Sequence, residues 1–522
     1  MHLPVIFPLA ISLLLVLSPA AVRRCAAQER TDDAPPYKPL VSPLARDSAT
    51  SLYTISIQDS GPLVVDLAGP LVWSTCTSDH PTFSCSSREC ASANGDGVTP
   101  APAPAPKPSC RKRPNCACTA HPCNPVTGRC AAGDLTSSPM SANTTDGRSL
   151  LPHPVSFSTV ASCAPENLLQ SLPAGAVGVA GLSRAPLSLP SQLAARRGLG
   201  SRFALCLPGV AMFGNTTIYL MGFPLELTSI IGRTPLVKNP KRSGGYYIPV
   251  VAITMVWTSG DTPAALPPRA LELDPATGRG GVTLSTVAQY TSMRSDVYGP
   301  FLQAFDAAIG APGTVKKVPE VAPFKLCYDA WSLRPLKRMG WDVPIIRLEL
   351  AAGASSNWTM YSGNSLVQVG DRTMCLAFLE MAVGSGSDDG PAVVIGTHQL
   401  EDNLLVFDAD NEELRDIALL FLEIIKLDVA ATKAFYAQKE EDKAAANANA
   451  KKKASRDKRR AESAAWKAAR AEKAARKEEE KKNGAGPSTI ILSSSSSFEW
   501  TSTPVSETTP SSSDYDWDSE SE

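Results

Sequence analysis

The sequence predicts an all-β protein with two lobes, followed by a helical and then a disordered C-terminal extension. Between residues 44 and 414, short segments rich in β-branched and aromatic residues alternate with clusters of Gly, Pro and Ser, as in strands joined by turns. Amphipathic helical patterns are scarce there, and 296–309 is the clearest. A chain of 522 residues has room for two or three domains.

The N-terminus has the pattern of a secretory signal peptide, which we place at 1–27. An apolar run from Val5 to Ala21 is followed by the small residues Cys25 and Ala27 before the expected cleavage site. A membrane anchor is the alternative, but the run is short and interrupted by prolines. We therefore expect a secreted, extracellular protein, in the apoplast or cell wall, without a membrane partner.

Cysteine usage agrees with export. Removal of the signal leaves twelve of the thirteen cysteines, and eight of these lie between Cys76 and Cys130. Such density is typical of disulfides in an oxidising compartment. A zinc site at Cys116, Cys118, His121 and Cys123 is the alternative, but the spacing is irregular and no second CxxC pair lies nearby. No metal or other cofactor is expected.

Three tripeptides predict N-glycosylation, at Asn143, Asn215 and Asn357. The net charge of −1 indicates no polyanionic or polycationic partner for the chain as a whole. We expect a monomer whose main domain does not bind nucleic acid.

The composition changes abruptly after residue 414. Residues 416–436 have apolar residues at helical spacing, and 439–482 are dominated by Ala, Lys, Glu and Arg, so 415–482 is predicted to be a helical extension. A solvated helix is favoured there over nucleic-acid contact by its basic runs. Residues 483–522, rich in Ser, Thr and acids, are predicted to be disordered. The change leaves open whether 415–522 belongs to the protein or results from an incorrect gene prediction.

An apolar strand in the segment Pro62–Trp73 delivers one acid, Asp66, to a tight turn and then re-enters apolar sequence. Pepsin-like aspartic peptidases present their first catalytic carboxylate in this way, before Thr or Ser and then Gly. Here Leu67 and Ala68 follow the acid instead. The segment therefore resembles a catalytic turn that has been altered.

Further blocks in the same order carry the resemblance. Residues 178–193 are similar to a segment of plant pepsin-like proteins, and 393–396 with 405–408 are similar to the region before the last strand of that family. The blocks 66–76, 143–147, 321–329 and 358–360 match the TAXI-type xylanase inhibitors of cereals and their basic-globulin relatives most closely. The resemblance implies a pepsin-like fold with an N-terminal lobe at 28–225 and a C-terminal lobe at 226–414.

A peptidase of this family needs a second carboxylate to share a proton with the first. The resemblance places it in 280–287, where Ser285 occupies the aspartate position and Val287 replaces a glycine. A serine hydroxyl cannot take a proton from water near neutral pH, and loss of the acid–base partner costs about 10²- to 10⁴-fold in rate. Asp59 and Asp274 are also acids in suggestive contexts, but both are predicted to be turn residues. We expect Asp66 to be a relic of the catalytic pair.

The resemblance therefore implies a secreted protein without peptidase activity that binds a protein partner, namely a microbial endo-xylanase, in plant defence. Two alternatives stay open. The first is an active aspartic endopeptidase that pairs Asp66 with another acid, and the second is a non-inhibitory extracellular binding or storage globulin.

The resemblance also bears on the cysteines and on the C-terminal end. It implies a disulfide between Cys327 and Cys375. The final strand of the family, with a His and a last Cys after it, is predicted to be absent, which would leave Cys206 without its partner. Cys123 would restore an even count, with a partner that the sequence does not identify.

Overall fold

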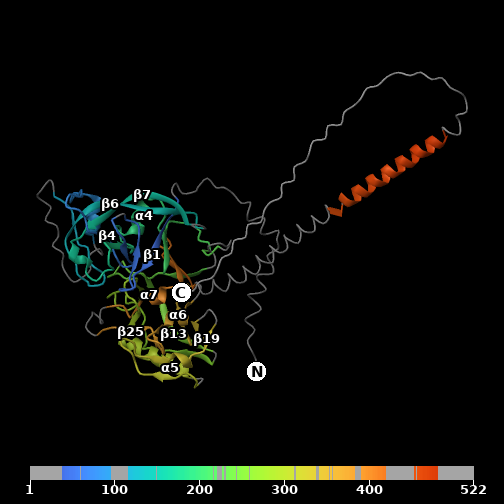
Figure 1. Cartoon of the computed structure of the whole chain (residues 1–522). Coiled ribbons are helices and arrows are strands. Elements are labelled where there is room, and N and C mark those ends of the chain that lie inside the picture. Colours follow the sequence, from blue (N-terminus) through green and yellow to red (C-terminus); the bar gives the residue numbers. More distant parts are fainter. Residues whose placement is uncertain are drawn as a thin grey trace, which may run out of the picture. The chain divides into compact units, whose positions relative to one another are not determined.

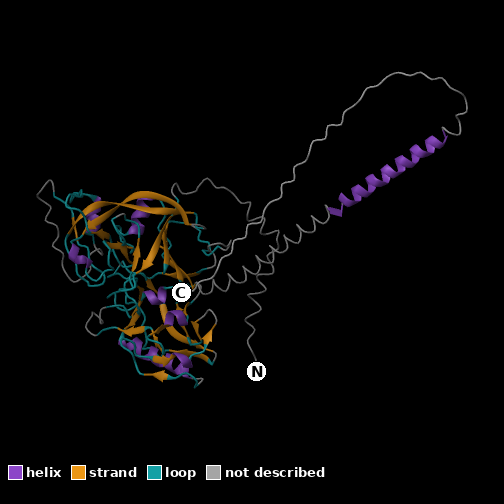
Figure 2. Ribbon diagram, viewed as in Figure 1, coloured by secondary structure: helices purple, strands orange, loops and turns teal. Residues whose placement is uncertain are grey.

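The computed structural model describes residues 38–418 and 452–479. Gaps within these ranges fall at 59, 96–115, 148–149, 216, 220–225, 229–230, 243, 258, 311–312, 337–339, 352, 355–356, 383–389 and 454. The predicted signal peptide (1–27) and the predicted disordered tail (483–522) lie outside the described residues. Among the described residues the fold is mainly β, with few and short helices in residues 38–418 (Figures 1 and 2).

The largest sheet contains thirteen strands in the order β11-β28-β27-β9-β10-β1-β2-β3-β8-β4-β7-β6-β5. Strand β1 also pairs with β6, so the strands from β1 round to β6 close on themselves. The bounds are β1 (Leu40–Arg46), β2 (Tyr53–Ile55), β3 (Leu63–Asp66), β4 (Val72–Ser74), β5 (Thr119–Ala120), β6 (Gly133–Thr145), β7 (Leu150–Cys163), β8 (Gly178–Gly181), β9 (Arg202–Cys206), β10 (Gly209–Phe213), β11 (Gly232–Pro235), β27 (Asn403–Asp408) and β28 (Glu413–Ala418). Three short helices accompany them: α3 (Arg88–Ala93), η2 (Glu166–Leu169) and α4 (Leu189–Arg197).

The second half of the chain forms smaller sheets of its own. One has the order β12-β15-β26-β16-β25, another β14-β13-β21-β22, a third β17-β18-β24-β23, and β19 pairs with β20. The bounds are β12 (Tyr247–Ile248), β13 (Val250–Trp257), β14 (Gly260–Pro263), β15 (Val282–Leu284), β16 (Thr291–Met293), β17 (Lys317–Val318), β18 (Cys327–Asp329), β19 (Pro335–Leu336), β20 (Gly340–Trp341), β21 (Ile345–Leu350), β22 (Trp358–Met360), β23 (Leu366–Gln368), β24 (Thr373–Leu376), β25 (Phe378–Glu380) and β26 (Val393–Ile395). The helices are α5 (Ser295–Gly310), η3 (Ala330–Ser332), α6 (Ser362–Ser365) and α7 (Thr397–Leu400).

The one clear helical pattern of the β-rich region is confirmed, because 296–309 lies inside α5. Val297, Phe301 and Phe305 recur at four-residue intervals and are fully buried, so one face of the helix packs on the core.

Strands from both halves of the chain meet in the largest sheet. The rings of Phe203 in β9 and Phe407 in β27 stack with centroids 4.7 Å apart, and Tyr246 packs on Phe407 at 4.6 Å. The Tyr246 hydroxyl donates a hydrogen bond to the Leu182 carbonyl at 2.8 Å. The two halves are therefore joined by an aromatic cluster that is buried and hydrogen-bonded.

The prediction that the final strand is absent is wrong. Strand β28 pairs antiparallel with β27 from Asn403↔Ala418 to Asp408↔Glu413, and with β11 on its other side. The β fold thus continues past residue 414, where the sequence analysis ended the lobe and began a helix. Long-range pairing at the edge of β27 overrides the helical spacing of the sequence there.

The structure describes a helix at 455–479 in the extension, and all its described side chains are exposed. Within the described residues, no helix combines the length and the apolar character needed to span a membrane.

Candidate functional site

The turn at Asp66 is delivered by a fully buried strand. Leu63, Val64 and Val65 of β3 are fully buried, and β3 runs parallel to β8 with Asp66 opposite Gly181. The backbone N–H of Ala68 donates to Asp66 Oδ1 at 2.9 Å, and the N–H of Gly69 donates to the Asp66 carbonyl at 3.1 Å. A side chain at Gly69 would come within 3.0 Å of the carboxylate, so a glycine is required there.

Asp66 is only 7% exposed. Burial disfavours the charged form and raises the pKa of Asp66 from 3.8 to about 6, against the smaller, opposite effect of the backbone N–H groups of Ala68 and Gly69. The group is therefore protonated in acid and ionised at neutral pH.

Ser285 lies in a second turn of the same design. It directly follows β15, which runs parallel to β26 as β3 runs parallel to β8. The Ser285 hydroxyl accepts hydrogen bonds from the N–H groups of Val287 at 3.3 Å and Ala288 at 3.2 Å. Ser285 Oγ therefore has the same role in the second turn as Asp66 Oδ1 has in the first. Each accepts a hydrogen bond from the backbone N–H two residues later in the chain.

Thr286 ties the two turns together. Its hydroxyl accepts a hydrogen bond from the Leu67 N–H at 3.0 Å and donates one to the Val65 carbonyl at 2.7 Å. Thr286 is fully buried. The sequence pattern alone did not single out Thr286, although this residue directly follows Ser285 as Leu67 directly follows Asp66. The apolar side chain of Leu67 offers no hydroxyl for a reciprocal bond.

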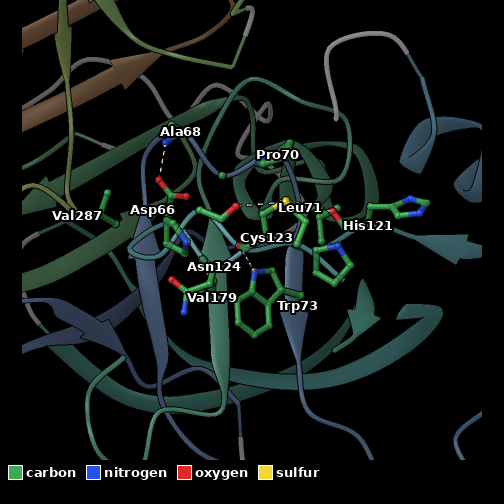
Figure 3. Close-up of a pocket in the computed structure, with 15 residues that line it drawn as sticks. Asp66, Ala68, Pro70, Leu71, Trp73, His121, Cys123, Asn124, Val179 and Val287 are labelled. Carbon is green, nitrogen blue, oxygen red and sulfur yellow. Dashed lines mark hydrogen bonds between the residues drawn. A yellow bond between two sulfur atoms is a disulfide. The ribbon is translucent and has the colours of Figure 1, made fainter. Parts of the chain in front are cut away.

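A cavity of about 320 Å³ opens beside Asp66 (Figure 3). Its walls are mostly apolar, and Asp66 supplies the one carboxylate among the residues that line it. Val287 lies on the Asp66 side of the cavity in Figure 3. The full lining consists of Asp66, Ala68, Gly69, Pro70, Leu71, Trp73, His121, Pro122, Cys123, Asn124, Pro125, Gly128, Cys130, Val179 and Val287.

A small disulfide-closed loop covers one wall of this cavity. Cys123 and Cys130, which are seven positions apart, are bonded to each other, and the Trp73 indole N–H donates to the Cys123 carbonyl at 3.1 Å. The Asn124 side chain donates to the carbonyls of Leu168 and Gln170 at 2.7 and 2.8 Å. The loop is therefore fixed by covalent and buried polar contacts, and Cys130 is the partner of Cys123 that the sequence did not identify.

The two other acids do not join the site. Asp274 forms a turn in which its Oδ1 accepts from the Ala276 N–H at 2.9 Å and its Oδ2 from the Thr277 hydroxyl at 2.6 Å. These hydrogen bonds lower the pKa of Asp274, the one to Thr277 most. Asp59 lies outside the described residues. Gly61 beside it donates its N–H to the Gln58 carbonyl at 3.3 Å.

The cysteines considered as zinc ligands are all in disulfides: Cys116 with Cys85, Cys118 with Cys90, and Cys123 with Cys130. Two more disulfides join Cys76 to Cys163 and Cys327 to Cys375, the second being the pair that the resemblance implied. Oxidised sulfur has no thiolate to offer a metal. Cys206 is the one free thiol among the described cysteines.

The predicted glycosylation sites differ in accessibility. Asn215 and Asn357 are exposed, whereas Asn143 is half-buried within β6. The Asn357 side chain accepts a hydrogen bond from the Leu350 N–H at 3.0 Å.

Comparison with known proteins agrees with this geometry. Residues 53–215 match the family described as "Xylanase inhibitor N-terminal", and 245–415 match "Xylanase inhibitor C-terminal". The chain is 41% identical to Chitinase CLP of Oryza sativa subsp. japonica over 397 residues, which cover 74% of this chain and 89% of that protein.

Solved structures give the same result. The crystal structure of edgp aligns with a TM-score of 0.64 at 30% identity, covering 75% of this chain and 98% of that one. Basic 7S globulin from soybean aligns with a TM-score of 0.56 at 27% identity, covering 74% and 98%. With both halves matched, in order, around the turns of Asp66 and Ser285, the chain belongs to the TAXI-type xylanase-inhibitor family of pepsin-like proteins.

Proposed function

We propose that this protein is a secreted, pepsin-like protein without peptidase activity that binds a microbial endo-xylanase and slows its turnover. One observation supports the first part: Asp66 is the only carboxylate among the residues that line the cavity. We further propose that Ser285 replaces the second acid that a pepsin-like enzyme needs. A single carboxyl group cannot act at once as general base and as proton donor in aspartic proteolysis. We propose that the two turns keep their backbone hydrogen bonds but no longer activate water for peptide hydrolysis.

The inhibitory part of the proposal is supported by membership of the xylanase-inhibitor family across both halves of the chain. Five disulfides among the described residues support secretion, because such cross-links persist in oxidising compartments. We further propose that the protein acts in the apoplast or cell wall as a monomer, with lobes at 28–225 and at 226 to the end of β28. Glycosylation at Asn143, Asn215 and Asn357 stays a prediction.

Inhibition assays on a panel of microbial endo-xylanases test the proposal. We expect the intact protein to reduce the initial rate of at least one xylanase in a saturable manner, and Asp66→Asn to inhibit equally because the carboxyl group plays no part in catalysis. Lack of inhibition across the panel, together with no complex in size-exclusion chromatography, would favour a storage or other binding globulin.

The active-peptidase alternative is tested with the same two proteins. Cleavage of a protein substrate at acid pH, blocked by a transition-state analogue and lost in Asp66→Asn, would establish peptidase activity. We expect both proteins to be inactive.

A second candidate function comes from the relative with 41% identity, whose name is Chitinase CLP. Most glycosidases use two carboxyl groups, about 5 to 9.5 Å apart. The single acid of the cavity does not favour this reaction. Release of reducing ends from colloidal chitin by the intact protein would nevertheless establish chitinase activity.

A further inference from the structure

Asp66 is a buried carboxylate without a positive partner. Its pKa is set by burial and by backbone N–H groups, and no charged side chain contributes to it. Within the described residues, no Lys, Arg or His forms an ion pair with it. A buried charge in this position is costly unless a counter-charge is supplied. At neutral pH the folded chain therefore holds a buried negative charge without a counter-charge.

One oxygen of this carboxylate is directed toward the residues that line the cavity (Figure 3). The other, Oδ1, accepts the Ala68 N–H, and the Gly69 N–H is the second backbone group that favours the ionised form. The cavity extends from Asp66 past the apolar side chains of Leu71, Val179 and Val287. A ligand entering it meets one anionic oxygen at one side and apolar surface on the others.

Two other polar side chains of the cavity are already engaged. The Asn124 amide donates to two carbonyls and accepts the N–H groups of Val126 and Thr127, and the Trp73 indole N–H is bonded to the Cys123 carbonyl. These groups hold the wall in place and are not available to a ligand, whereas the Asp66 carboxylate supplies the one negative charge of the lining.

One other titratable side chain, His121, lines the cavity, and Figure 3 shows its ring directed away from Asp66. Its Nδ1 is buried without a hydrogen-bond partner among the described atoms. Across the junction of the two turns, the hydroxyls of Ser285 and Thr286 are neutral and hydrogen-bonded to the backbone. Arg184, after β8, lies over the Tyr246 ring at 5.3 Å.

We propose that this cavity binds a small organic cation, a protonated primary amine with one aromatic or aliphatic ring, through a charge-assisted hydrogen bond to Asp66. An ammonium group supplies the missing counter-charge, and such bonds are about twice as strong as neutral ones. The ring would contact the apolar wall. The volume of about 320 Å³ is at the small end of ligand pockets and fits a ligand of this size. This inference does not rest on xylanase binding and survives if that proposal fails.

Isothermal titration of the full-length protein with three probes of equal size tests it: benzylamine, benzyl alcohol and benzoate. At about pH 7.5, above the pKa of about 6, we expect benzylamine to bind roughly 10- to 100-fold more tightly than benzyl alcohol, and benzoate not to bind. Equal affinity for the amine and the alcohol would overturn the proposal, and so would preferential binding of benzoate.

Two variants locate the binding site. Asp66→Asn keeps an oxygen to accept the Ala68 N–H but loses the charge, so we expect it to lose the preference for benzylamine. Asp274→Asn is the matched control, because Asp274 accepts the N–H two residues later in the same way but lies outside the cavity. Unchanged amine binding in Asp66→Asn, or loss in Asp274→Asn, would refute the assignment. If Asp66→Asn does not fold by near-UV circular dichroism, the comparison of probes on the natural protein decides.

Acidification provides an independent readout. At about pH 4.5 Asp66 is protonated, so benzylamine binding should weaken by roughly tenfold or more. His121 is the other ionisable side chain of the lining, so His121→Gln is the control, and this variant should keep the pH dependence. Loss of the pH dependence in His121→Gln would assign it to the histidine and contradict the role of Asp66.

Discussion

The hydroxyl of Thr286 and the backbone N–H of Leu67, 219 residues apart in the chain, form a buried hydrogen bond of 3.0 Å. The same hydroxyl donates to the Val65 carbonyl at 2.7 Å. One side chain thus satisfies a donor and an acceptor of the opposite turn. The apolar side chain of Leu67 cannot form the equivalent hydrogen bonds to the turn of Ser285. Thr286 is therefore the side chain that links the two turns.

Thr286→Val should therefore destabilise the protein. The substitution keeps the shape of the side chain but leaves the Leu67 N–H and the Val65 carbonyl buried without a partner, at about 1–3 kcal/mol for each such group. We expect the free energy of unfolding in guanidinium chloride to fall by about 2–4 kcal/mol. Thr262→Val, in the partly exposed strand β14, is the control and should change it little. Equal stabilities of the two variants would show that the hydrogen bonds of the Thr286 hydroxyl contribute nothing to the free energy of unfolding.

Asp66 should make stability depend on pH. Its pKa is higher in the folded protein, about 6, than the ordinary 3.8, so the folded state binds the proton more tightly. Below pH 3.8 Asp66 is protonated in both the folded and the unfolded state, so its ionisation does not lower the free energy of unfolding. This free energy falls as the pH rises from 3.8 through the folded pKa of about 6. The difference between the two pKa values corresponds to about 3 kcal/mol.

Asp66→Asn removes this cost. We expect the variant to exceed the natural protein in unfolding free energy at about pH 7.5 and to match it near pH 3.5, as measured by denaturant titration at each pH. Asp274→Asn should show no gain at neutral pH, because hydrogen bonds lower the pKa of Asp274 and favour its ionised form. A variant of Asp66 that is equally or less stable at neutral pH would contradict the burial argument.

The end of the β fold can be located by truncation. A chain that stops after residue 418 keeps β28 paired on both sides, whereas one that stops after residue 411 removes it and exposes the edges of β27 and β11. Leu414, which is fully buried, is also lost in the shorter chain. We expect the longer chain to keep the melting temperature of the full protein, and the shorter one to melt lower or to aggregate. Identical melting curves would show that β28 is dispensable.

Among the described cysteines, we expect Cys206 to be the one that iodoacetamide alkylates when no reductant is added. The structure leaves it free, while Cys327 and Cys375 are bonded to each other. Burial raises the pKa of Cys206, so its thiolate is scarce and alkylation of the native protein should be slow at neutral pH and faster after unfolding. Mass spectrometry of iodoacetamide-treated peptides gives the result. Label on Cys327 or Cys375 without a reductant would contradict the disulfide pattern.

The sequence by itself determined the features that depend on local pattern. The apolar strand before Asp66, the helical spacing of Val297 and Phe301, and the alternation of short strand-like segments with turn residues are all properties of short segments, and they sufficed for the fold class. Local spacing failed after residue 414, where the predicted helical pattern begins at residue 416, inside the segment Glu413–Ala418 that forms β28.

Only the tertiary structure decided the contacts between distant segments. It brought Thr286 to Leu67, closed the loop between Cys123 and Cys130 against Trp73, and left Asp66 facing an apolar cavity without a counter-charge. The physical reason is that hydrogen-bond pairing, disulfide connectivity and burial depend on which surfaces meet in space. The periodicity of a single segment does not identify the segment that it contacts.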